Sequence, residues 1–173
     1  MRTSFFAATL SLVAQVAVAQ GAPEGFTTGP LLEGQGPNAE VPGMTPLPKR
    51  ARLKVAFDVG KGAKEGEANR TLVSAARFMN MHVRAGMAPE RLAAAVVVHG
   101  KAVGDVSGAA AGTPNGPLIE ALVANNVRVI VCGQSAAAQG VSAEDLLPGV
   151  EMSLSAMTAH ALLQQDGYTV NPF

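Results

Sequence analysis

The chain has 173 residues and carries 13 basic and 13 acidic side chains, so its formal net charge is zero. A chain of this length accommodates one ordinary globular domain. The balanced charge argues against binding to nucleic acid or to an anionic membrane surface. Tryptophan is absent and Tyr168 is the single tyrosine, so aromatic platforms that stack bases or sugars are not expected.

Residues 1–19 have the pattern of a secretory signal peptide. Arg2 supplies positive charge, an apolar stretch follows from Phe5 to Val18, and the segment ends in the small-x-small pattern of a cleavage site. The apolar stretch is too short for a good membrane anchor. We therefore expect cleavage before Gln20 and a periplasmic or secreted protein that does not insert into a membrane.

Residues 20–51 are rich in proline and glycine, which interrupt the periodicity of helices and of strands. This composition predicts an extended arm without regular structure. The arm still contains scattered apolar residues such as Phe26, Leu31 and Leu32. We expect these side chains to dock onto the domain or onto a neighbouring subunit.

From residue 52 to residue 173, apolar runs alternate with amphipathic segments. The runs predict buried strands at 53–59, 92–98 and 127–131, and a weaker alternation predicts strands at 150–154 and 168–170. Helices are predicted at 69–84, from Asn115 as N-cap, briefly after Cys132, and at 155–165. This order predicts an α/β fold, a three-layer sandwich with a mainly parallel, doubly wound sheet of about five strands.

Polar side chains follow the ends of the predicted strands. Because the carboxyl ends of parallel strands share one edge of the sheet, we expect these residues along that edge, where open α/β sheets bind ligands. The candidates for ligand binding are Asp58, Asn69, Asn115, Gly133, Gln134, Ser135 and Ser155. Asn69 and Asn115 are interpreted first as helix caps and only second as ligand contacts, and an ordinary strand-to-helix turn is at least as common an explanation for the amides of 133–135.

Cys132 is the single cysteine of the chain and lies between the third strand and the short helix. Helix amides lower the pKa of a thiol in such a position, which makes Cys132 the candidate nucleophile. His99, at the end of the second strand, is the candidate partner that orients the thiol or moves a proton. An exported chain with one cysteine leaves three alternatives, an inert buried thiol, an intermolecular disulfide or a reactive thiol.

Other binding motifs are weak in this sequence. The glycine-rich segment 60–66 lacks the Gly-Lys-Ser/Thr end of a phosphate-binding loop. His99, Cys132 and a methionine could hold a soft ion, but no cluster has the spacing of metal ligands, so neither a metal nor a cofactor is expected. His82 is assigned to a surface or subunit contact, and His160 is assigned no role.

Several stretches together resemble the DsrE/DsrF-like family, in particular its exported members. The longest is the run from Val131 to Gly140, with sequence VCGQSAAAQG. Further stretches are Val98-His99-Gly100, Ala76 to Asn80, Pro148-Gly149-Val150, Leu154 to Met157, and the ending from Gly167 to Phe173. The likeness covers residue 52 to the end.

This resemblance implies a small α/β sandwich that assembles into homotrimers or homohexamers. It also places Cys132 at the position where sulfur-relay members accept sulfane sulfur as a persulfide and pass it to a partner. We expect an exported DsrE-like protein with a reactive cysteine, tuned by His99, that exchanges sulfur with a protein or a small sulfur compound. The alternatives are a non-catalytic, homo-oligomeric module that binds a small ligand at the same edge, and a purely structural assembly subunit.

Overall fold

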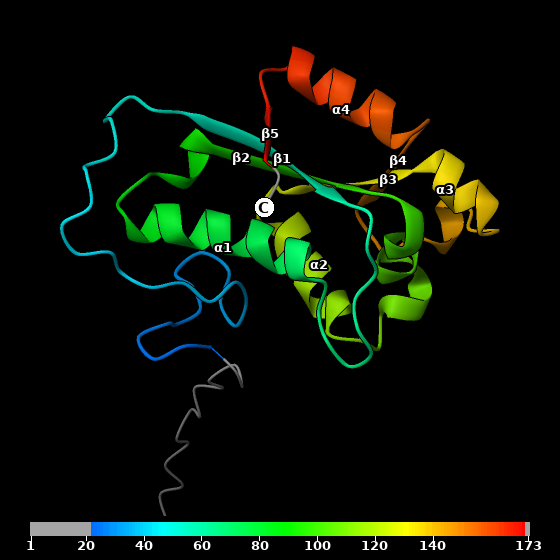
Figure 1. Ribbon diagram of the computed structural model, residues 1–173, viewed down its shortest axis with the longest axis horizontal. Coiled ribbons are helices and arrows are strands. Elements are labelled where there is room, and N and C mark those ends of the chain that lie inside the picture. Colours follow the sequence, from blue (N-terminus) through cyan, green and yellow to red (C-terminus); the bar gives the residue numbers. More distant parts are fainter. Residues whose placement is uncertain (1–21, 172–173) are drawn as a thin grey trace, which may run out of the picture.

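The computed structural model describes residues 22–171, and the predicted signal peptide lies outside them. Five parallel strands form one sheet in the order β4-β3-β2-β1-β5 (Figure 1). Their bounds are Leu53–Val59 for β1, Leu92–Val98 for β2, Arg128–Cys132 for β3, Val150–Ser153 for β4 and Thr169–Asn171 for β5. The α/β fold with a mainly parallel sheet is therefore confirmed.

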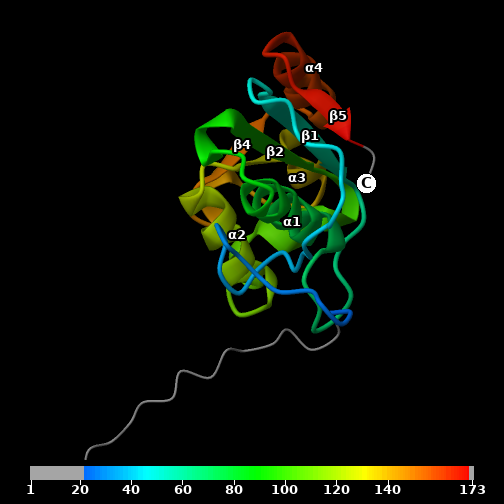
Figure 2. The ribbon, with the colours of Figure 1, turned by 90° about the vertical axis from the view of Figure 1, so that its left-hand side faces the viewer.

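Helices cover both faces of this sheet. Helices α1 (Arg70–Arg84) and α2 (Asn115–Ala124) lie on one face, and α4 (Ala156–Gln165) lies on the other (Figures 1 and 2). Helix α3 (Gly133–Ala138) begins directly at the end of β3. Short 3₁₀ turns complete the connections, at Pro89–Arg91, Gly100–Val106, Gly108–Ala110 and Ala143–Asp145.

The central strands are buried on both faces, which explains their continuous apolar sequence. In β2, Val96 and Val98 belong to the large core under α1 and α2, whereas Val97 faces α4. The α4 side has a much smaller core, which includes Ile130 and Leu163. Side chains alternate along a strand, so Cys132, two residues after Ile130, lies on the α4 side of the sheet.

The arm before the sheet contains neither a helix nor a named strand within residues 22–51. It is nevertheless attached to α1. Asn80, which is completely buried, accepts hydrogen bonds from the backbone N–H groups of Leu31 (3.0 Å) and Leu32 (2.7 Å). Leu32 itself is 1% exposed. The arm therefore packs against its own domain.

Several predicted boundaries differ from the structure by one residue, and two of these differences concern candidate site residues. Pro114 occupies the N-cap position of α2, and Asn115 is the first helical residue, so its assignment as the N-cap was wrong. The Asn115 side chain instead accepts a hydrogen bond of 2.7 Å from the backbone N–H of Asn69. In addition, β3 runs to Cys132 because it pairs with β4 as far as Ser153.

Within residues 22–171, none of the helices has the length and apolar character required to span a membrane.

Candidate functional site

Cys132 occupies two structural positions at once. It is the last residue of β3 and the N-cap of α3, where its Sγ accepts a hydrogen bond from the backbone N–H of Ser135 at 3.4 Å. The residue is only 5% exposed. A strand-to-helix junction thus points backbone donors at the sulfur, as the sequence predicted from the position of this single cysteine.

Several hydrogen-bond donors converge on this sulfur. Burial raises the pKa of the Cys132 thiol, but hydrogen bonds from the side chain and backbone of Ser135 and from the backbone of Ala156 and Gln134 lower it. The donors outweigh burial, and the net pKa lies below the ordinary thiol value. Hydrogen bonds to a thiolate favour the charged form, so the site stabilises the nucleophilic form of sulfur.

Two helices contribute these donors. Gln134 and Ser135 belong to α3, whereas Ala156 begins α4. The two helix starts lie close together, since a Cβ added to Gly133 would be 2.7 Å from the carbonyl oxygen of Ser153. Glycine at position 133 therefore allows α3 to pack against the connection between β4 and α4.

His99 lies at the end of β2, as predicted, but its ring contacts Asp58 on β1. Its Nε2 is 3.0 Å from Oδ2 of Asp58, and a Cβ added to Gly60 would be 2.7 Å from the imidazole Cε1. Cys132 lies on β3, at the other side of β2. The connection between them runs through the backbone, because Gly100 N–H donates to Ser135 Oγ at 3.1 Å.

Asp58 is a second centre of the edge. It is exposed on the α4 face and contacts two imidazoles, with His160 Nε2 at 2.8 Å from Oδ1 in addition to His99. Partial burial raises the pKa of Asp58, but the hydrogen bonds and charges of His99 and His160 lower it further, so the net pKa is below its usual value. Asp58 is therefore an ionised acceptor between two donors.

His160 is the site residue that sequence reasoning missed. It lies on α4, next to the buried residue Ala159 and three residues before Leu163, which is also buried. That spacing places position 160 near the inward face of the helix, and this was the available signal. The helix packs across β2 and β3 and brings His160 to Asp58, 102 residues earlier in the chain.

The remaining predicted residues separate by role. Ser155 is the N-cap of α4 and accepts a hydrogen bond of 3.1 Å from Thr158 N–H. Asn69 is the N-cap of α1, and its amide also donates to Asp105 Oδ2 at 2.7 Å. Asn69 and Asn115 are both 3% exposed and belong to the α1–α2 side of the fold. Their bonds hold the loop between β1 and α1.

Comparisons with known proteins add to this geometry. The sequence model of the DsrE/DsrF-like family matches residues 54–172. The chain belongs to this family. A solved structure of a protein of unknown function from Methanobacterium thermoautotrophicum has a TM-score of 0.53 to this DsrE-like chain at 20% identity, covering 70% of this chain and 99% of that one. This likeness shows the fold. None of the curated proteins matches the chain.

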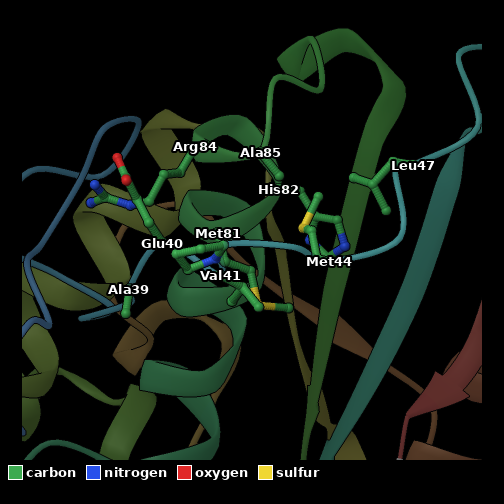
Figure 3. A pocket seen from close by; sticks show the side chains of 10 residues that line it. Ala39, Glu40, Val41, Met44, Leu47, Met81, His82, Arg84 and Ala85 are labelled. Carbon is green, nitrogen blue, oxygen red and sulfur yellow. The ribbon is translucent and has the colours of Figure 1, made fainter.

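A pocket of about 420 Å³ lies elsewhere on this DsrE-like domain, between the arm and the last turn of α1 (Figure 3). Its lining includes Val41, Met44, Met81 and His82, and none of the predicted site residues. The His82 ring is held by a 2.7 Å contact between Nδ1 and the carbonyl oxygen of Phe78. Within residues 22–171, histidine, cysteine and acidic side chains form no cluster suited to a metal ion.

Proposed function

We propose that this chain is an exported, homo-oligomeric DsrE-like sulfur carrier that uses Cys132 as the acceptor of sulfane sulfur. The observation that carries the proposal is the convergence of backbone donors from α3 and α4 on the Cys132 thiol. Membership of the DsrE/DsrF-like family supports it. The resemblance of the sequence around Cys132 to sulfur-relay members, which implies a persulfide-carrying cysteine at this position, supports it as well.

The chemistry requires an ionised thiol and a donor with a sulfur–sulfur bond. The Cys132 thiolate attacks the outer sulfur of a polysulfide or of thiosulfate and forms a new sulfur–sulfur bond. The old bond breaks, and the leaving group, a shorter polysulfide or sulfite, takes its electron pair. An acceptor thiolate then attacks the outer sulfur of the Cys132 persulfide and releases the Cys132 thiolate, so the cycle needs no external oxidant or reductant.

Neighbouring groups support both steps. The donors on Ser135 and Ala156 stabilise the negative charge of the thiolate before attack and again when it leaves. We assign Gly133 to close packing of the two helix starts, and Gln134, which is exposed, to contact with the sulfur compound. His99 acts indirectly, since the residue after it donates to Ser135.

Homo-oligomer formation is supported by the surface around α4. Large apolar side chains are exposed there, at Leu154 (71%), Met157 (80%) and Leu162 (56%). Val170 on β5 is also exposed, and it pairs with Ala56, which belongs to the core under α4. Apolar patches of this kind mark protein–protein contacts. Export is supported by the signal-peptide pattern of residues 1–19.

The test is mass spectrometry of the purified mature chain after treatment with inorganic polysulfide or thiosulfate. We expect a mass increase of one or more sulfur atoms on the peptide containing Cys132, reversed by a thiol reductant. Cys132→Ser is the matched control, since serine retains the ability to cap α3. An unmodified Cys132, under conditions that label a free thiol in a reference protein, contradicts the proposal. Retention of a bound small ligand by Cys132→Ser would instead favour a binding module.

A further inference from the structure

One carboxylate ties together three segments of the α4 face. Asp58 on β1 contacts His99 at the end of β2 and His160 on α4, at 3.0 Å and 2.8 Å. Carboxylate oxygens only accept hydrogen bonds when ionised, so both Nε2 atoms carry the hydrogen in these contacts. Asp58 thus fixes the orientation of two imidazole rings and links α4 to a strand two positions away from β3.

The second nitrogen of His160 has no partner. The His160 side chain is only 17% exposed, and its Nδ1 atom is buried. Within the described residues, Nδ1 makes no hydrogen bond. Leaving a buried polar atom unpaired is unfavourable, so an apolar side chain would fill this position better if filling were its role. A histidine at position 160 can donate a hydrogen bond to Asp58, whereas a leucine could only fill the space.

His160 lies one helical turn after Ala156, so the two residues share a face of α4. The start of α4 lies beside Cys132, because Cys132 pairs with Ser153 and the chain reaches the Ser155 cap of α4 two residues later. From this turn, the backbone of Ala156 helps to lower the pKa of the Cys132 thiol. The other anchors of this end of α4 are the Ser155 cap and the packing of Ala159, which is 3% exposed. A bond from His160 to the sheet therefore restrains the same turn that points its amide at sulfur.

We propose that His160 is a positioning residue, which ties α4 to β1 through Asp58 and thereby holds the first turn of α4 against the Cys132 thiol. The inference builds on the proposed role of Cys132 and names what keeps its surroundings in place. Without this tie, the first turn of α4 moves relative to β3 and the thiolate loses one of its donors. Cys132 then ionises at higher pH.

The experiment measures the rate of iodoacetamide alkylation of Cys132 as a function of pH in three variants of the mature chain. His160→Gln retains an N–H donor for Asp58, and His160→Leu removes it. Gln164→Leu is the control, because it changes an exposed residue of the same helix. Each variant is first checked for cooperative thermal unfolding.

We expect His160→Leu to raise the pKa of Cys132 by about half a unit, which lowers alkylation at neutral pH about threefold. His160→Gln restores most of the wild-type profile, and Gln164→Leu leaves it unchanged. An unchanged profile in His160→Leu overturns the proposal. An equal shift in His160→Gln and His160→Leu also overturns it, since the effect would then not depend on the donor.

A variant on the sheet gives a second test that does not depend on the fold of α4. Asp58 is exposed, so Asp58→Ala preserves the core; it removes the contacts with both His160 and His99, and we expect a shift at least as large as in His160→Leu. Adding His160→Leu to Asp58→Ala should give no further shift, because the first change has already removed the contact of His160. Additive shifts in the pKa of Cys132 would contradict a positioning role for the contact between His160 and Asp58. The alkylation measurements need no sulfur donor. If the wild type fails to form a persulfide, the proposed function is contradicted, but the positioning role of His160 is not.

Discussion

The two faces of the sheet differ in how completely they are filled. The α1–α2 face holds the large core, and its buried polar residues Asn69, Asn80 and Asn115 all have internal hydrogen bonds. The α4 face has a small core under one helix, a cysteine at the strand end, and an unpaired buried nitrogen on His160. Most of the buried apolar core lies on the first face, and the proposed nucleophile lies on the second.

The largest expected effect is a loss of stability when the core on the α1–α2 face is disrupted. Leu72 on α1 is completely buried, so Leu72→Ala removes apolar contacts and leaves a cavity. We expect the free energy of unfolding to fall by about 2–5 kcal/mol. Gln164→Ala on α4, at an exposed polar position, should change it by less than about 0.5 kcal/mol. Urea denaturation measures both, and equal losses would remove the contrast between the faces.

The next effect concerns the arm, residues 22–51, which is attached to the α1–α2 face through Asn80. Asn80→Ala leaves the backbone N–H groups of Leu31 and Leu32 without their acceptor. We expect a loss of about 2 kcal/mol in the free energy of unfolding, together with faster proteolysis within residues 22–51. Gln164→Ala, at an exposed position, is the control. Unchanged proteolysis would show that this bond does not hold the arm.

A smaller effect is expected at the α4 face. Ser135→Ala removes a side-chain donor to Cys132 and the acceptor of Gly100 N–H. The pKa of Cys132 should rise by about half a unit to one unit, because a hydrogen bond contributes about 1 kcal/mol. The pH dependence of alkylation measures this. A profile identical to that of the wild type would mean that the hydroxyl does not act on the sulfur.

The smallest effect concerns acid stability. The pKa of Asp58 is lowered in the folded chain, so its contacts stabilise the fold above the unfolded value of about 3.9 and are lost as pH falls through the folded pKa. Asp58→Asn should therefore lose less stability than the wild type on acidification from about pH 5 to about pH 2. Urea denaturation over this range checks the slopes, and parallel slopes would contradict a stabilising role of the carboxylate.

Much of the sheet could be predicted from the sequence. The run from Leu92 to Val98 is apolar at every position because both of its faces are buried, and its predicted bounds agree with β2. The end of β3 was harder to place. Cys132 continues the apolar run but also caps α3, and the pairing with Ser153 that makes it a strand residue involves a distant segment.

The site was only partly predictable for a similar reason. The positions of Cys132 and His99 at strand ends follow from parallel strands, which share one edge. The direction of the His99 ring does not follow, because β2 has a neighbour on each side and the ring could turn to either. The contact of His160 with Asp58 depends on how α4 crosses the sheet, and local periodicity does not contain that information.

The central claim is that backbone and hydroxyl donors make Cys132 an ionised nucleophile at the edge of the sheet. Its most direct test is the pH dependence of iodoacetamide alkylation in the wild-type chain, where the single cysteine makes the signal specific. We expect alkylation to reach half of its maximal rate below the ordinary thiol pKa of about 8.5. A midpoint above that value, or a thiol that reacts only after unfolding, would contradict the claim.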